Sequence, residues 1–256
     1  MLKPIFLGFL NTQHSQQVES KINKIVITID SSVGGYETIV DGYSIKGSIV
    51  LASLFFQKFK RNPKPNDEVT FVVEENVAVV GDTVLTPAIS FLNWGGSKSV
   101  KLINKGLIVG RGGTCGLGTK GEDTYAENQY IGMAKGGVGI QSASEFPTVI
   151  ENYGTISCGG NSSYYLWRMD NGKFASFGYP YGGAPFGKST YQKGDTHILG
   201  AEDATLLVTG ICYLPNNKKY VSKMSIGEGN GGRNFAITKG NYELININQG
   251  KTIGYV

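Results

Sequence analysis

Residues 102–113 and 149–160 repeat one short pattern, LINKGLIVGRGG and VIENYGTISCGG. In each copy an aliphatic strand is followed by an Asn-x-Gly turn, a second aliphatic strand and a Gly-Gly pair. Because one such unit buries little surface by itself, copies have to stack on one another to build a core. The repeat therefore predicts a mainly β fold of stacked short strands, either β-helix-like or sandwich-like.

Short aliphatic runs elsewhere in the chain support this prediction. From Glu68 onward turn residues recur about every 8 to 12 residues, which is typical of an all-β protein. The runs predict strands at residues 24–29, 69–73, 77–80, 88–92, 100–103 and 107–109. Residues 43–59 differ, because their apolar side chains recur at roughly helical spacing. They predict a short helix that ends before Pro63, since proline cannot donate the next helical hydrogen bond.

The sequence divides near residue 66, after this predicted helix. We expect an N-terminal attachment region at residues 1–66 and a glycine-rich β domain at residues 67–256. The chain has 37 glycines in 256 residues, against a usual share of about 7%. The excess begins near Gly95, and no G-X-Y period indicates collagen. We expect the Gly-Gly pairs to form tight corners between strands; they stand at 95–96, 112–113, 136–137, 159–160, 182–183 and 231–232.

Two long stretches, residues 114–148 and 161–200, contain few aliphatic runs and much Gly, Ser, Tyr and Asn. Long segments of this kind in a compact domain are usually functional loops. The second stretch is also rich in aromatic residues, which give a binding loop a large contact area at low entropic cost. The alternative is that these rings pack the loop against its own scaffold. Our candidate contacts are Tyr164, Tyr165, Trp167, Tyr179 and Tyr181.

The segment GGAPFGKS, residues 182–189, has the spacing of a phosphate-binding P-loop. A working P-loop requires a buried strand before it and a helix after it. The preceding ASFGYPY contains no aliphatic strand, no helical stripe follows, and Pro185 removes an amide donor. We therefore predict a glycine corner with Ala184-Pro185-Phe186 at its tip and no nucleotide cofactor. Gly116, Gly118 and Gly121 have the spacing G-x-G-x-x-G, but the residues that follow them show no βαβ pattern.

Charge and composition argue against several other classes. The net charge of +4 is small, and the basic cluster of Lys58, Lys60, Arg61 and Lys64 is short, so we expect no nucleic-acid partner. With two histidines and three widely spaced cysteines, no metal site is expected, and the thiols are expected to be buried. The longest later apolar run, IVLASLFF, is too short to span a membrane, and no signal peptide is apparent.

No catalytic constellation stands out. Asp195 and His197 lie close together, but no nucleophile elbow accompanies them. Carboxylates such as Glu74, Glu75, Glu122 and Asp123 could form a glycosidase pair, yet they fit exposed strand ends and loops more simply. We therefore expect a protein that is not an enzyme and has neither a metal nor another cofactor.

Several motifs, taken in order, carry a resemblance to a known family. They are Val77 to Gly81, Thr83 to Ala88, Leu102 to Gly113, Asn152 to Gly160 and Gly182 to Gly187. Together they resemble the glycine-rich receptor-binding proteins of tailed bacteriophages, which are tail-fibre tip adhesins and related tail-fibre or tip modules. The resemblance covers roughly residues 43–190. The chain departs from the most glycine-rich members, whose polyglycine II helices pack together, because it has short Gly-Gly pairs and no long glycine run.

The resemblance implies a virion protein whose partners are other virion proteins and a bacterial outer-surface protein or polysaccharide. Under this reading, the aromatic residues of 161–191 contact the host receptor, and residues 1–66 attach the protein to the particle. An architectural head-fibre, decoration or baseplate protein without receptor binding is the first alternative, and a polysaccharide depolymerase is the second. A homo-oligomer is a further expectation, since fibres are often trimeric, although no trimeric coiled coil is evident.

Overall fold

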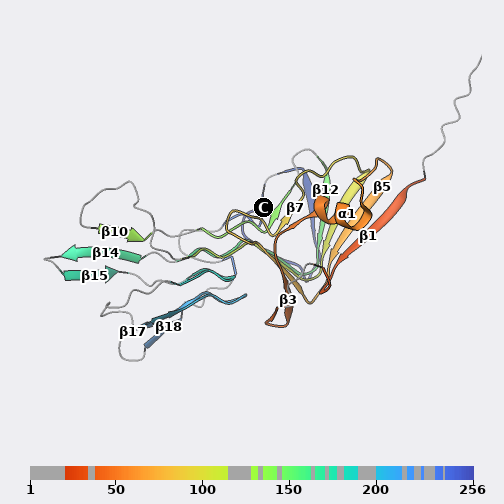
Figure 1. The fold of residues 1–256 in the computed structure, drawn as a ribbon. Helices are drawn as coiled ribbons and strands as arrows, with labels where there is room; N and C mark the ends of the chain where they lie inside the picture. Colours follow the sequence, from red (N-terminus) through yellow and green to blue (C-terminus); the bar gives the residue numbers. More distant parts are fainter. Residues whose placement is uncertain are drawn as a thin grey trace, which may run out of the picture.

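The structure is a computed structural model. It describes residues 21–33, 38–114, 128–131, 135–142, 146–162, 165–170, 173–177, 182–189, 200–214, 218–221, 226–227, 234–238 and 240–256. The molecule is elongated, with a body at one end and two small sheets at the other (Figure 1).

Three sheets form the body, and their strands run parallel except for one antiparallel edge pair, β2 with β3. The first sheet has the order β1 (Asn23–Ile29), β5 (Asp67–Val73), β8 (Ser99–Asn104), β12 (Thr148–Asn152) and β20 (Tyr242–Asn246). The second has the order β2 (Ile39–Val40), β3 (Tyr43–Lys46), β6 (Val77–Val80), β9 (Leu107–Val109), β13 (Thr155–Ser157) and β21 (Lys251–Ile253). The third has the order β19 (Ile237–Thr238), β11 (Ile140–Gln141), β7 (Ile89–Ser90) and β4 (Ile49–Val50).

The chain visits these sheets in a fixed rotation, which makes the body a parallel β-helix. One coil consists of β5, β6 and β7, the next of β8, β9 and β11, and the next of β12, β13 and β19. The two copies of the sequence repeat lie in consecutive coils, with Asn104 opposite Asn152 and Ile108 opposite Ile156. The mainly β prediction is confirmed, and of its two forms the β-helix is the one observed.

Alternation of side chains along the strands places the core inside the coils. β5 alternates buried and partly buried residues, and Val69, Phe71 and Val73 face the main core. By contrast, every residue of β6 is buried. Its Val77 and Val79 face the main core, while Ala78 and Val80 face a second cluster on the other side of the sheet. Residues Ala184, Ala204 and Leu206 of this second cluster cover the outer face of the second sheet.

The predicted helix is shorter than expected, and this is a correction. Residues 43–50 form β3 and β4, and only α1 (Leu51–Phe59) is helical. Ile45, Ile49 and Val50 are β-branched and favour strands, and the parallel neighbours β6 and β7 supply hydrogen bonds that the sequence spacing does not reveal. The strand predicted at 88–92 is likewise only β7. The strands predicted around 24–29, 69–73, 77–80, 100–103 and 107–109 are confirmed.

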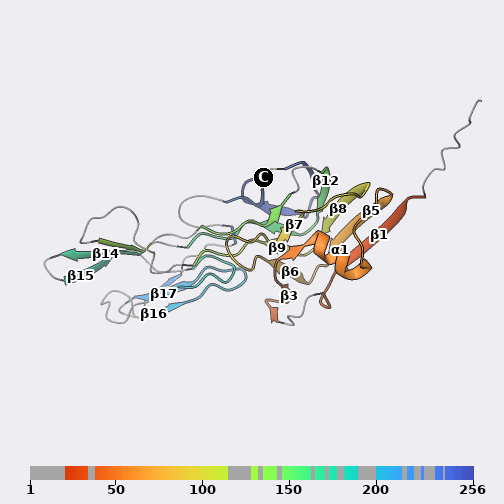
Figure 2. The same cartoon turned by 45° about the horizontal axis from the view of Figure 1, so that its top comes forward.

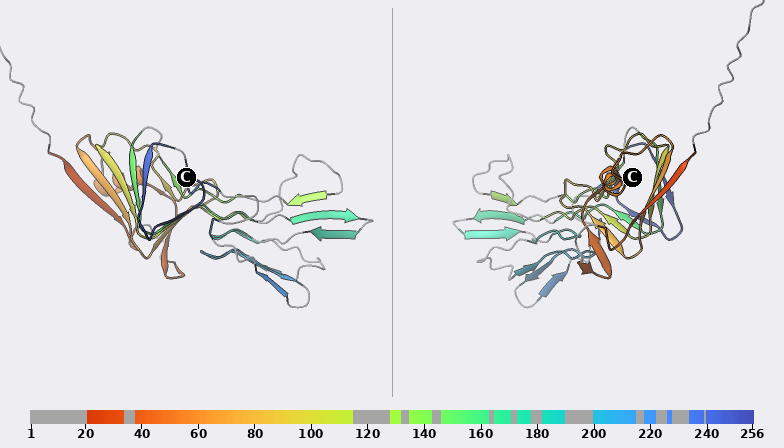
Figure 3. Two further views of the ribbon diagram at one scale, coloured as in Figure 1. Left: turned by 180° about the vertical axis from the view of Figure 1, so that it is seen from behind. Right: turned by 45° about the vertical axis from the view of Figure 1, so that its right-hand side comes forward.

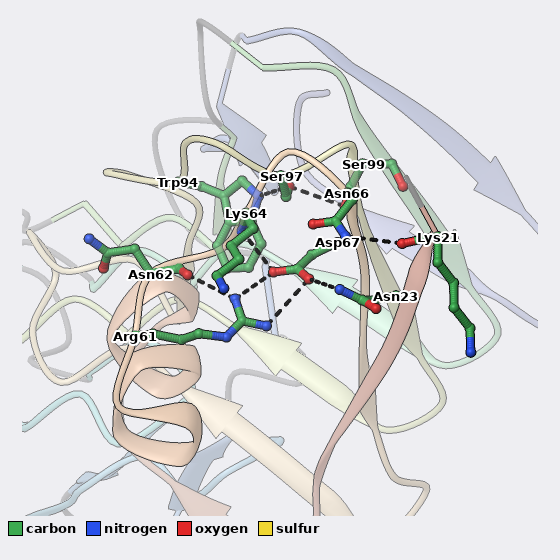
Figure 4. Close-up of polar contacts among 10 residues, drawn as sticks. All are labelled: Lys21, Asn23, Arg61, Asn62, Lys64, Asn66, Asp67, Trp94, Ser97 and Ser99. Carbon is green, nitrogen blue, oxygen red and sulfur yellow. Dashed lines mark hydrogen bonds and ion pairs between the residues drawn. The ribbon is translucent and has the colours of Figure 1, made fainter. Parts of the chain in front are cut away.

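A buried carboxylate fastens α1 to the first sheet (Figure 4). The Arg61 guanidinium, just after α1, donates two hydrogen bonds to Asp67, at 2.6 and 3.3 Å. Asn23 of β1 donates to the same carboxylate at 3.2 Å, and the Lys64 amide donates at 2.7 Å. The side chain of Asp67 is fully buried, so these donors replace its water. Strand β1, which precedes the expected domain boundary at residue 66, also pairs with β5, which follows it. The division into two domains stays a prediction.

Two antiparallel sheets lie at the end of the molecule away from the body (Figures 1 and 2). One has the order β10 (Asn128–Ile131), β14 (Tyr165–Asp170) and β15 (Lys173–Phe177). The other has the order β16 (Gly200–Glu202), β17 (Ile211–Leu214) and β18 (Lys218–Val221). We call them the distal sheets. The expectation that 114–148 and 161–200 are loops is therefore wrong for β10, β11, β14 and β15, which lie within them.

Candidate functional site

The distal sheets are joined to the body through a set of glycine-rich segments, which we call the glycine layer. It comprises residues 110–113, 136–137, 159–160, 182–183 and 187. Segments 110–113 and 159–160 follow β9 and β13, segment 136–137 precedes β11, and residues 182–187 lie between β15 and β16. Figure 3 shows the described chain running between body and distal sheets. The Gly-Gly pairs of the sequence repeat are thus the points where the chain leaves the β-helix.

Backbone hydrogen bonds tie each segment of the glycine layer to several others. Gly113 donates to the Gly160 oxygen at 2.9 Å, and Gly183 donates to the Gly113 oxygen at 2.9 Å. Gly137 donates to the Arg111 oxygen at 2.7 Å, so segment 110–113 has three bonded neighbours. A strand in a flat sheet has at most two hydrogen-bonded neighbours. The glycine layer is therefore a three-dimensional lattice, and its glycines do more than form the corners that we expected.

Close backbone approach explains why these positions are glycine. A Cβ atom on Gly159 would overlap the Arg111 carbonyl oxygen, and one on Gly112 would overlap the Gly183 oxygen. Most of the layer is buried, although glycine contributes no apolar side chain to a core. Its cohesion therefore comes from satisfied backbone groups, each of which would be costly to bury without a partner.

The GGAPFGKS segment forms a turn inside this layer, as predicted. Gly187 donates to the Gly183 oxygen at 2.9 Å and closes the turn, while Ala184 and Pro185 are buried rather than displayed. Six of its amides donate hydrogen bonds within the protein; they belong to Gly182, Gly183, Phe186, Gly187, Lys188 and Ser189. These six amides are therefore not free to hold phosphate in the way that the amides of a P-loop do.

One charged side chain lies where the layer meets the body. The Arg111 guanidinium lies 5.2 Å from the centre of the Phe186 ring and donates to the Phe186 carbonyl oxygen at 3.3 Å. Burial lowers the pKa of Arg111, and the charge of Asp82 raises it. A cation over an aromatic face is favourable, so Arg111 helps to hold the turn on the second sheet.

The candidate contact residues lie in or next to the distal sheets. Tyr165 and Trp167 belong to β14, where Trp167 is opposite Gln129 of β10 and Ser176 of β15. Tyr164, Tyr179 and Tyr181 lie outside the described residues, and the prediction that these five residues are contacts stays a prediction.

Sequence reasoning overlooked the hairpin that holds two of these positions. The register pairs Asp170 with Lys173, which leaves Asn171-Gly172 between the strands. Asn-Gly between two alternating runs is a strong sequence signal for a two-residue β-hairpin. That signal was available, but the high content of Gly, Ser and Tyr concealed it.

Comparison with known protein families shows which family the chain belongs to. The family model described as phage tail fibre adhesin Gp38 matches residues 24–254. The chain belongs to this family. The tail fibre adhesin family covers the β-helix, the glycine layer and the distal sheets alike, which is more of the chain than the residues 43–190 that carried the resemblance. No curated protein and no solved structure gives a match to this adhesin-family chain.

Membership in the adhesin family makes this a virion-associated protein of the tail fibre. Among the described residues, no cluster of three or more His, Cys, Asp or Glu side chains could hold a metal ion. Within the same residues no helix is long and apolar enough to cross a membrane. Cys158 is buried, as expected. Cys115 lies outside the described residues, and nothing is described of the Cys212 side chain.

Proposed function

We propose that this adhesin binds a receptor on the host cell surface through its distal sheets, without catalysing a reaction. The observation that supports this most is the placement of two small sheets at the far end of the molecule. They are carried on the glycine layer, in which segment 110–113 is hydrogen-bonded to three other segments. A rigid support lowers the entropic cost of binding, because the contact surface is ordered before it meets its partner. The aromatic composition around β14 favours the same role.

A cell-binding assay tests this proposal. We expect the purified chain to bind host cells, and we expect Trp167→Ala or Tyr165→Ala to weaken binding by about tenfold or more, as for aromatic hot spots. Tyr153→Ala is the matched control, because Tyr153 is an exposed aromatic residue of the body, in the turn between β12 and β13. Equal binding by all variants would remove these residues from the contact, and no binding by the unaltered chain would favour the architectural alternative.

We further propose that the N-terminal region attaches the adhesin to the fibre, and that the exposed face of α1 takes part. Phe56 on this helix is 51% exposed, next to a hollow of about 490 Å³ that is also lined by Gln57, Pro63 and Asn93. An exposed ring beside a hollow is typical of an interaction site. Phe56→Ser should lower incorporation into particles without lowering cell binding by the free chain, whereas Val208→Ser, at another exposed apolar position, should affect neither.

A depolymerase remains the less favoured alternative, as no described feature supports catalysis. Incubating the chain with host capsule or lipopolysaccharide should release no new reducing ends. Their appearance would contradict the non-enzymatic proposal directly.

A further inference from the structure

A pocket lies on the body side of the glycine layer, and the residues that line it are outside the strands of the distal sheets. Its volume is about 260 Å³, roughly the share of nine liquid water molecules. Its walls are partly apolar, formed by Val40, Ile45, Val80 and Phe186. Its polar groups include Thr38, Lys46, Asp82 and Arg111. Small ligands are usually bound in this kind of hollow, where apolar walls surround a few placed polar groups.

Arg111 enters this pocket with most of its hydrogen-bonding capacity unused. A guanidinium has five N–H donors, and among the described residues that of Arg111 makes one hydrogen bond, to the Phe186 carbonyl oxygen. Within the described part of the chain, no carboxylate forms an ion pair with it. A partly buried guanidinium in this state matches the two oxygens of a carboxylate, which it can bind through paired hydrogen bonds.

Asp82 supplies the opposite chemistry on another wall. One oxygen of its carboxylate accepts the Ser48 amide at 3.2 Å and lies against Gly47, where a Cβ would collide with it. No hydrogen bond to the other oxygen, Oδ2, is seen among the described residues. Thr38 is a further polar residue that lines the pocket. A carboxylate and a hydroxyl suit the hydroxyl groups of a ligand, because the carboxylate accepts their hydrogen bonds and the hydroxyl can either donate or accept.

The geometry points to a binding site for an acidic monosaccharide, with the sugar carboxylate on Arg111 and ring hydroxyls on Asp82 and Thr38. The apolar walls, which include Phe186, would contact the carbon face of the ring. This site goes beyond the proposed receptor contact, since none of its lining residues belongs to the distal sheets.

Titration of the full chain with sodium glucuronate, followed by ligand-observed NMR, tests the site. We expect a dissociation constant in the millimolar range for glucuronate. Glucose, which lacks the carboxylate, should bind at least about tenfold more weakly. Arg111→Gln should weaken glucuronate binding by about tenfold or more, because a charge-assisted pair is lost. Lys188→Gln is the control, since Lys188 is exposed in the same turn but does not line the pocket.

A second variant separates loss of the site from loss of folding. Thr38→Trp fills the pocket from an exposed position and leaves Arg111 in place, so it should also abolish binding while the unfolding temperature stays unchanged. The inference is overturned if glucuronate shows no binding up to about 50 mM, if glucose binds equally well, or if folded Arg111→Gln and Thr38→Trp chains keep the affinity of the unaltered protein. None of these outcomes depends on whether the distal sheets bind a receptor.

Discussion

At the scale of single residues, the chain is constrained most where backbones approach each other. Gly110, Gly136 and Gly159 are each positioned so that a Cβ would overlap a carbonyl group of a neighbouring segment. Gly95 also stands next to another glycine, yet a Cβ there would meet nothing within 4 Å. The same residue type is therefore required at some positions of this sequence and exchangeable at others.

Gly159→Ala should destabilise the protein, whereas Gly95→Ala should not. The added methyl group in the glycine layer forces segments 110–113 and 159–160 apart, which we expect to cost about 1–3 kcal/mol or more, as overpacking does. At Gly95 the change should leave stability equal or raise it by up to about 1 kcal/mol, because the unfolded chain loses freedom. Thermal unfolding of the two variants measures both effects, and equal losses would show that close approach is not what selects glycine.

Asp67 makes the stability of the body sensitive to acid. Hydrogen bonds from Arg61, which has the largest effect, and from Lys64 and Asn23 lower the pKa of Asp67 from 3.8 to about 2, against the opposing effect of burial. The unfolded state therefore binds the proton more tightly than the native state. The resulting stabilisation is complete above about pH 4 and is lost as the pH falls through about 2.

The Asp67→Asn variant should accordingly be less stable than the unaltered chain at neutral pH. Its unfolding temperature should also fall less steeply between pH 4 and pH 2, since the titrating group is gone. Melting curves collected across this range check the prediction. Parallel acid dependence of the two proteins would mean that Asp67 does not carry it.

At the scale of elements, the coils of the β-helix are linked by a ladder of asparagines at the turn after the first sheet. Asn104 donates to Asn152 at 2.8 Å, and Asn152 donates to Asn246 at 3.0 Å. In the preceding coil Val73 occupies the equivalent position, and no group in the described part of the chain donates to the Asn104 Oδ1 atom. The ladder fixes the register between coils, because a shift by one residue would leave these buried amides without partners.

Replacing Asn152, in the middle of the ladder, should lower the free energy of unfolding more than replacing Asn246 at its end. Asn152→Ala breaks bonds to Asn104, Asn246 and the Lys251 carbonyl group inside the body, and we expect a loss of about 1–3 kcal/mol. Asn246 is exposed, so water can replace its partners and Asn246→Ala should cost about 1 kcal/mol or less. Chemical denaturation measures both, and equal losses would contradict the role of burial.

Elements that depend on local pattern could be predicted from the sequence, and those that depend on distant partners could not. VAVV at 77–80 is a strand because of its own residues, and β6 has the same bounds. Residues 43–50 read as part of a helix, but parallel pairing with β6 and β7 makes them strands. The glycine layer could not be derived from Gly-Gly pairs alone, since its bonds join residues such as Gly113 and Gly183. At the site, Tyr165 and Trp167 were placed in a loop because the Asn171-Gly172 hairpin signal was overlooked.

At the scale of the whole molecule, three parts follow each other along one direction: the β-helix, the glycine layer and the distal sheets. The chain passes through the layer repeatedly, because it leaves the body after β9 and after β13 and rejoins it at β11 and at β19, while Ala184, Ala204 and Leu206 pack on the second sheet in between. Such an arrangement holds the far end by several chain segments at once.

The most direct test of this account is hydrogen–deuterium exchange of the full chain with and without host outer-membrane vesicles. Binding through the distal sheets predicts slower exchange in the peptides that contain β10, β14, β15, β16, β17 and β18, with unchanged exchange in β5, β8 and β12. Protection confined to the body, with the distal sheets exchanging as in the free chain, would contradict the central claim that this adhesin contacts its host through the distal sheets.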